Sequence, residues 1–170
     1  MRAPGTQPIE ELSLEGAEAA AFDRALDLLS VQDRTERGLR DRLATDGHSN
    51  DDIDDAVARL KELGLVDDLS FALEFVERRG RLKRLAPQGL IAELEAKGVT
   101  PEIARQAVEE AGIDEEAAAI EVASDLMARV AGLPPARQVG RIQSALARRG
   151  YSEEACEAAL RAVLPPEGWD

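Results

Sequence analysis

The chain of 170 residues has few aromatic side chains and only one cysteine. Aromatic residues make up 3% of the sequence, so the cores have to be built mainly from alanine and branched aliphatic side chains. A single cysteine excludes a disulfide framework within the chain and is typical of a reducing compartment. No apolar run approaches the roughly 18 residues of a membrane span, and Met1–Gly5 lack the apolar stretch of a signal peptide. We therefore expect a cytoplasmic protein with no membrane contact.

The residue patterns of common catalytic and metal sites are also missing. His48 is the only histidine, and the chain has neither zinc-ligand spacing nor a phosphate-binding glycine loop. Cys156 falls on the apolar stripe of the last expected helix, where it is predicted to be a small core residue. Adjacent Asp67 and Asp68 stand at a helix start, where acidic residues usually cap the helix. We predict that the protein is not an enzyme and uses no metal or cofactor.

Positive charge is scarce, since 21 basic residues stand against 34 acidic ones and the net charge is −13. Such a balance opposes autonomous binding to DNA, because that binding requires neutralised phosphates. Two segments nevertheless concentrate basic residues without an acid between them. We predict that they bind the partner: Arg78, Arg79, Arg81, Lys83 and Arg84 in the first segment, and Arg141, Arg148 and Arg149 in the second. The alternative for the first segment is a helix C-terminus whose cations complement the helix dipole, and for the second it is a solvated helix face.

One phrase occurs three times along the chain. Two apolar residues four apart are followed after four more positions by glycine, then by one variable residue and by Ser or Thr. The copies are Leu39, Leu43, Gly47, His48 and Ser49; Leu90, Leu94, Gly98, Val99 and Thr100; and Ile142, Leu146, Gly150, Tyr151 and Ser152. The glycines are 51 and 52 residues apart. Such a repeat indicates one helical unit used three times, an architecture that usually presents a binding surface rather than a catalytic pocket.

Each phrase predicts two helices joined by a tight corner. Apolar residues four apart lie on one face of a helix, and the glycine closes that helix in a left-handed conformation. The Ser or Thr two residues later is a preferred N-cap, so a second helix begins almost at once. In the second phrase, Pro101 follows Thr100 at the first helical position, where its missing N–H costs nothing.

A further amphipathic stretch precedes each phrase. The first contains Phe22, Ala25, Leu26 and Leu29 at the spacing of a helix, and no segment alternates as a strand does. The predicted fold class is therefore all-α, with three tandem three-helix repeats. The predicted boundaries are a disordered tail at 1–17, repeats at 18–64, 65–112 and 113–164, and a C-terminal tail at 165–170 that contains Trp169.

Residues 64–78 resemble the signature of the RecX family of bacterial regulatory proteins. They read Gly-Leu-Val-Asp-Asp-Leu-Ser-Phe-Ala-Leu-Glu-Phe-Val-Glu-Arg. The family pattern is Gly, two apolar residues, Asp-Asp, two variable positions, Phe-Ala, an aromatic residue and a basic one. The likeness covers roughly residues 20–164 and keeps the order of the three repeats. Where the family usually has a basic residue on each side of Leu90, this chain has Gly89 and Ile91.

The resemblance implies a monomer that binds RecA and its nucleoprotein filament. It would suppress strand exchange, ATP hydrolysis and coprotease activity, and so act in homologous recombination, DNA repair and the SOS response. It also implies that the three repeats form an elongated curved rod lying in the filament groove, in contact with RecA or DNA. Two alternatives stay open, a stand-alone helix-turn-helix DNA-binding regulator and a helical scaffold for another partner.

Overall fold

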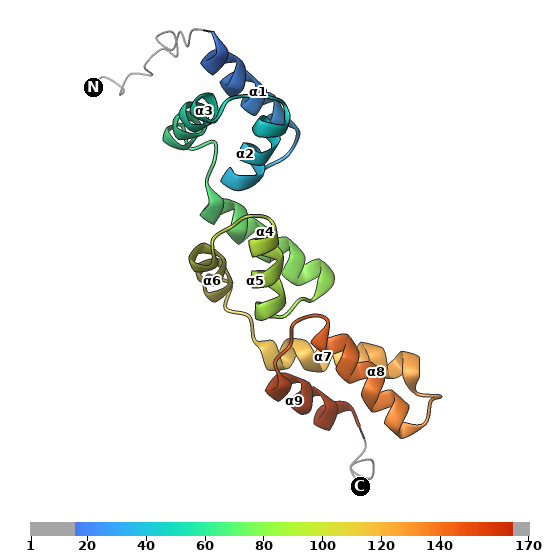
Figure 1. Ribbon diagram of the computed structural model, residues 1–170. Coiled ribbons are helices and arrows are strands. Elements are labelled where there is room, and N and C mark those ends of the chain that lie inside the picture. Colours follow the sequence, from blue (N-terminus) through green and yellow to red (C-terminus); the bar gives the residue numbers. More distant parts are fainter. Residues whose placement is uncertain (1–15, 165–170) are drawn as a thin grey trace, which may run out of the picture. The chain divides into compact units, whose positions relative to one another are not determined.

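The computed structural model describes residues 16–164, and within that range it contains nine α-helices and no strand (Figure 1). Their bounds are α1 Ala17–Val31, α2 Glu36–Thr45, α3 Asn50–Glu62, α4 Asp68–Lys83, α5 Pro87–Ala96, α6 Pro101–Glu110, α7 Glu115–Val130, α8 Pro135–Ala147 and α9 Glu153–Val163. The predicted all-α fold is confirmed. The C-terminal tail with Trp169 and nearly all of the predicted N-terminal tail lie outside the described residues.

The helix corners form as the three phrases predict. Gly47, Gly98 and Gly150 have φ values of 94°, 91° and 83°, a region that a residue with a Cβ rarely adopts. At the second corner the Val99 amide donates to the Leu94 carbonyl oxygen at 3.1 Å, and the other two corners repeat this hydrogen bond. These bonds satisfy carbonyl groups that the end of a helix leaves without a partner.

The helices that follow the corners are capped by the predicted hydroxyl groups. Ser49, Thr100 and Ser152 each accept a hydrogen bond from the backbone amide three residues later. Each cap satisfies one of the N–H groups that the first turn of a helix cannot pair internally. One glycine and one hydroxyl residue therefore end one helix and start the next.

The chain divides into two compact units, Met1–Asp67 and Asp68–Asp170. In the first unit, α1 to α3 enclose a core centred on Leu39, Leu43 and Leu60, which are fully buried. The apolar stripe predicted for α1 is wrong at Leu26, which is 36% exposed. The buried face of α1 instead carries Leu28, with alanines on the same side of the helix, so the stripe is rotated from the predicted one.

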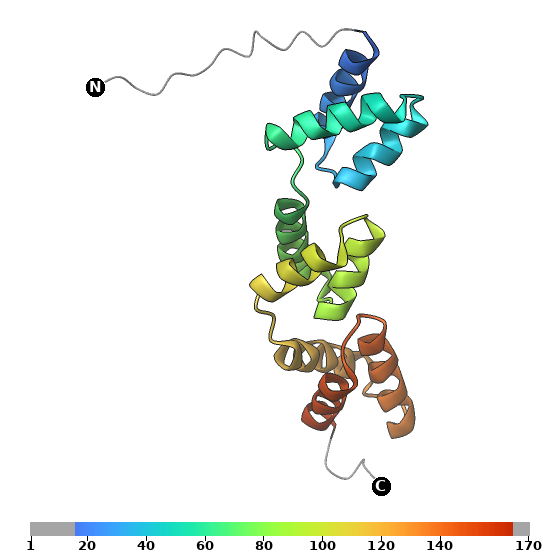
Figure 2. The same cartoon turned by 60° about the vertical axis from the view of Figure 1, so that its left-hand side comes forward.

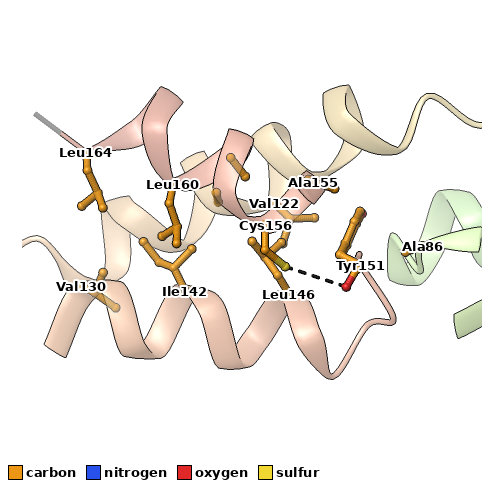
Figure 3. Close-up of a cluster of buried hydrophobic side chains, with 13 residues drawn as sticks. Ala86, Val122, Val130, Ile142, Leu146, Tyr151, Ala155, Cys156, Leu160 and Leu164 are labelled. Carbon is orange, nitrogen blue, oxygen red and sulfur yellow. Dashed lines mark hydrogen bonds between the residues drawn. The ribbon is translucent and has the colours of Figure 1, made fainter. Parts of the chain in front are cut away.

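The second unit contains two hydrophobic clusters, one formed by α4 to α6 and one mainly by α7 to α9 (Figure 2). In the latter, Ile142 and Leu146 of α8 point toward Leu160 and Cys156 of α9 (Figure 3). Cys156 lies in the same cluster with 6% of its surface exposed, which confirms its predicted place in the core. Burial raises the pKa of its thiol, so the group is held in its unreactive protonated form.

Backbone contacts join the corner at Gly150 to the start of α5. In both ribbon views this corner lies against the N-terminal end of α5 (Figures 1 and 2). The Ala86 amide donates to the Arg149 carbonyl oxygen at 3.0 Å. A Cβ placed on Gly89 would lie 2.3 Å from that same carbonyl oxygen, and one on Gly150 would lie 2.3 Å from the Gly89 nitrogen. A side chain does not fit at position 89, which explains why no basic residue stands there.

Side chains also contact one another where the corner at Gly150 meets the start of α5. The Tyr151 hydroxyl donates to the Arg84 carbonyl oxygen at 3.1 Å, and the Arg84 guanidinium is ion-paired with Asp125 of α7. Tyr151 is buried beside Ala86 at the edge of the α7–α9 cluster (Figure 3). We name the contacts of Arg84, Ala86, Gly89, Gly150 and Tyr151 the α5–α9 joint.

Candidate partner-binding surface

Arg79, the second cation of the first basic segment, has partners within its own repeat. Its Nε lies 3.2 Å from a carboxylate oxygen of Glu93 in α5, and its guanidinium lies 5.6 Å from the ring centre of Phe75. The Phe75 ring is 2% exposed, so Arg79 covers one side of the core. These contacts tie α4 to α5 and account for Arg79 without an external partner.

Arg84 is also held by the protein itself. Helix α4 ends at Lys83, and Arg84 follows in a left-handed conformation with φ 48°. Its side chain pairs with Asp125, and its carbonyl oxygen accepts the Tyr151 hydroxyl. An unfavourable backbone conformation at a residue other than glycine is maintained only where surrounding contacts fix it, and the α5–α9 joint supplies them here.

Arg78 and Lys83 are the members of this segment that the structure leaves to solvent. Both are exposed, and neither forms an ion pair with another described residue. Leu82 between them in sequence is 76% exposed, a large apolar side chain that sequence reasoning did not single out. The side chain of Arg81 lies outside the described part of the chain. Among its described side chains, the first segment thus presents two exposed cations that form no ion pair within the protein, together with an exposed leucine.

In the second segment, Arg141 and Arg148 line one groove between α7 and α8. The groove has a volume of about 500 Å³, and Arg129 of α7 lines it as well. Arg141 lies in α8, and Arg148 caps the C-terminal end of that helix with a helical backbone conformation, so the two lie about two turns apart on the same face. No acidic residue belongs to the lining, which also comprises Leu126, Val130, Gly140, Ile142, Ser144 and Ala145. We call this feature the arginine groove.

Arg149 does not belong to the arginine groove. Its side chain donates to the Ala145 carbonyl oxygen at 2.9 Å, and its own carbonyl oxygen accepts the Ala86 amide. The residue is half-buried, and its contacts place it at the α5–α9 joint. Of the three arginines of the second segment, Arg141 and Arg148 therefore line the groove, whereas Arg149 stabilises the fold.

Sequence reasoning missed Arg129 and Gly140 of the groove. Arg129 stands in the last turn of α7, where interaction with the helix dipole is by itself sufficient to explain a cation. Gly140 interrupts α8 without bending the chain into a turn. Glycine destabilises the interior of a helix, so its presence there often has a packing or functional reason. Gly140 was therefore the feature of the sequence that could have indicated this groove.

A second groove lies between α4 and α6 and has the opposite charge. Its volume is about 540 Å³, and Glu74, Glu77 and Glu110 are among its lining residues, with no basic residue. Neither these glutamates nor any other group of three or more His, Cys, Asp or Glu side chains in residues 16–164 is placed to hold a metal ion. No helix in that range is both long and apolar enough to cross a membrane.

Residues 21–60 match the first three-helix domain of RecX, and residues 67–108 match the second. The regulatory protein RecX of Streptomyces lividans is 34% identical over 149 residues, which cover 85% of this chain and 78% of that protein. The chain belongs to the RecX family. RecX of Mycobacterium avium strain 104 is 33% identical over 156 residues, or 90% of each chain. RecX is a family of regulatory proteins rather than enzymes.

The helical fold is also that of RecX structures. The crystal structure of RecX from Lactobacillus salivarius superimposes with a TM-score of 0.78 and covers 86% of this chain and 96% of that one. Sequence identity over the match is 21%, so this likeness supports the fold. The RecX fold therefore extends across most of the described residues.

Proposed function

We propose that this RecX-family protein binds RecA on DNA and lowers the activity of the nucleoprotein filament. Family membership carries the proposal, together with the signature at residues 64–78. The mechanism is occupancy rather than chemistry. A protein lying along several RecA subunits opposes filament extension or blocks access of a second DNA or of a repressor. ATP hydrolysis, strand exchange and coprotease activity then fall together.

The exposed cations supply the candidate contacts. Arg78 and Lys83 at the end of α4, and Arg141 and Arg148 in the arginine groove, are available to an acidic or phosphate-bearing surface. A net charge of −13 disfavours long-range attraction to bare DNA, so we expect binding to need RecA. This expectation separates the proposal from a regulator that binds DNA by itself.

The test is ATP hydrolysis by RecA from the same organism on single-stranded DNA, titrated with the folded protein. We expect the rate to fall at or below a stoichiometric ratio. Arg78→Glu with Lys83→Glu should weaken inhibition, and so should Arg141→Glu with Arg148→Glu. The matched control is Arg137→Glu with Arg161→Glu, which changes the net charge equally at exposed positions outside the groove lining.

Two results would contradict the proposal. One is an unchanged rate of ATP hydrolysis with protein whose helicity and melting are verified. The other is tight, salt-dependent binding to bare duplex DNA with no effect of RecA, which would favour the stand-alone DNA-binding regulator.

A further inference from the structure

The arginine groove combines cations with an apolar surface, and this combination limits the chemical classes of ligand that it can bind. Leu126 and Val130 of α7 and Ile142 of α8 line it together with the three arginines. We propose that the arginine groove binds a short peptide segment of a protein partner in which every third residue carries a carboxylate and the residues between are apolar. The carboxylates pair with the arginines, and the apolar side chains cover the floor between them.

The spacing of the cations sets the spacing of the carboxylates. Arg141 and Arg148 are two helical turns apart, which is about 10.5 Å along the axis of α8. A peptide in the polyproline II conformation has three residues per turn and advances about 3.1 Å per residue, so carboxylates three residues apart lie on one face about 9.3 Å apart, close to the separation of the two arginines. Arg129 faces the groove from the opposite helix and can pair with a further carboxylate or with the peptide backbone.

Gly140 gives an independent reason to expect a ligand in this groove. It lies inside α8, where glycine is less stable than alanine by about 1 kcal/mol. A Cβ placed on it would have no atom within 4 Å, so nothing in the protein requires a glycine there. The missing side chain keeps the groove open beside Arg141, and close approach of a peptide backbone is one of the few advantages that glycine offers.

The same features disfavour nucleic acid as the ligand. No aromatic side chain lines the groove, so unpaired bases lack the ring surfaces on which they mainly stack. A nucleic acid strand would also extend beyond the groove, and its phosphates would then be repelled by a protein whose net charge is −13. A short acidic peptide is confined to the groove, and the glutamates of the α4–α6 groove repel it from that site.

The experiment uses the full-length protein and a fluorescein-labelled peptide of about ten residues that repeats Glu-Leu-Val. We expect saturable binding by fluorescence anisotropy at low salt. A peptide with serine in place of Leu and Val, and a single-stranded oligo-dT of similar charge, should both bind at least about tenfold more weakly. Arg141→Glu with Arg148→Glu should weaken peptide binding by about tenfold or more, because two charge pairs become repulsive.

A second variant tests the groove without changing its charge. Gly140→Leu places a side chain into the open groove at a position compatible with the helix, so we expect weaker binding with unchanged helicity. The control pair Arg137→Glu and Arg161→Glu should bind as the wild type does. Absence of saturable binding, equal binding by the groove variants, or tighter binding of oligo-dT that the groove variants abolish would each overturn the inference.

The inference stands apart from the proposed function. If the groove variants lose the peptide but still inhibit RecA fully, the groove serves another acidic partner and the proposed function survives. If wild-type protein binds the peptide and has no effect on RecA, the groove inference survives and the proposed function fails.

Discussion

Gly89→Ala should destabilise the second unit, although the same change elsewhere in its helices should stabilise it. Replacing glycine by alanine in a helix normally raises the free energy of unfolding by about 0.5–1 kcal/mol, partly because alanine reduces the conformational freedom of the unfolded chain. At position 89 the new Cβ would lie 2.3 Å from the Arg149 carbonyl oxygen and 3.1 Å from its carbonyl carbon. Carbon and oxygen atoms do not approach so closely, and both atoms belong to backbone that cannot rotate away.

The cost can be estimated from what has to move. Relieving the overlap separates α5 from the corner at Gly150 and stretches the hydrogen bond from the Ala86 amide to Arg149. Overpacking of this kind costs about 1–3 kcal/mol, and weakening the hydrogen bond adds about 0.5–1.5 kcal/mol. After the helix gain is subtracted, we expect a net loss of about 0.5–4 kcal/mol, centred on about 2 kcal/mol, and a fall in melting temperature of several degrees.

The assay is urea and thermal unfolding followed by circular dichroism, with amide hydrogen exchange at Ala86 as the local readout. Gly80→Ala in α4 and Gly140→Ala in α8 are the matched controls, because neither new Cβ would have an atom within 4 Å. We expect both controls to gain stability by about 0.5–1 kcal/mol. If Gly89→Ala gains as much and leaves exchange at Ala86 unchanged, the α5–α9 joint does not constrain the unit as argued.

Three further predictions concern the joint and a corner. Tyr151→Phe removes the donor to the Arg84 carbonyl oxygen, so chemical unfolding should show a loss of about 1 kcal/mol, and equal stability would exclude a net contribution from this bond. Burial raises the pKa of Tyr151, the only tyrosine, so its ultraviolet titration should have its midpoint above the ordinary value of about 10. Because the folded state keeps this proton longer than the unfolded state, stability should fall as the pH rises from about 10 through the folded pKa, and a midpoint at the ordinary value would argue against burial. Gly98→Val should cost at least about 1 kcal/mol, since φ there is 91°, and unchanged melting would contradict the left-handed corner.

Short-range sequence patterns specify the local structure of this protein. The Leu-x3-Leu-x3-Gly phrase followed by Ser or Thr specifies a helix, its left-handed end and the cap of the next helix. These are short-range interactions, such as the hydrogen bond that the Ile103 amide donates to the Thr100 hydroxyl oxygen, so residues a few positions apart contain all the information. The signature at residues 64–78 indicated the family for the same reason, because it is contiguous.

The role of each arginine depends on contacts between helices that are distant in sequence. Arg79 and Arg84 carry the same charge as Arg78, yet they are held by Glu93 and Asp125, which are distant in sequence. Arg129 and Arg148 share a groove because α7 packs on α8, and no spacing along the chain shows that. Gly89 departs from the family pattern in sequence, and in the structure it is the residue at which the backbone of α5 contacts the backbone of the corner at Gly150. Long-range packing assigns these roles, since a cation at a helix end looks the same in sequence whether it faces a core, a carboxylate or solvent.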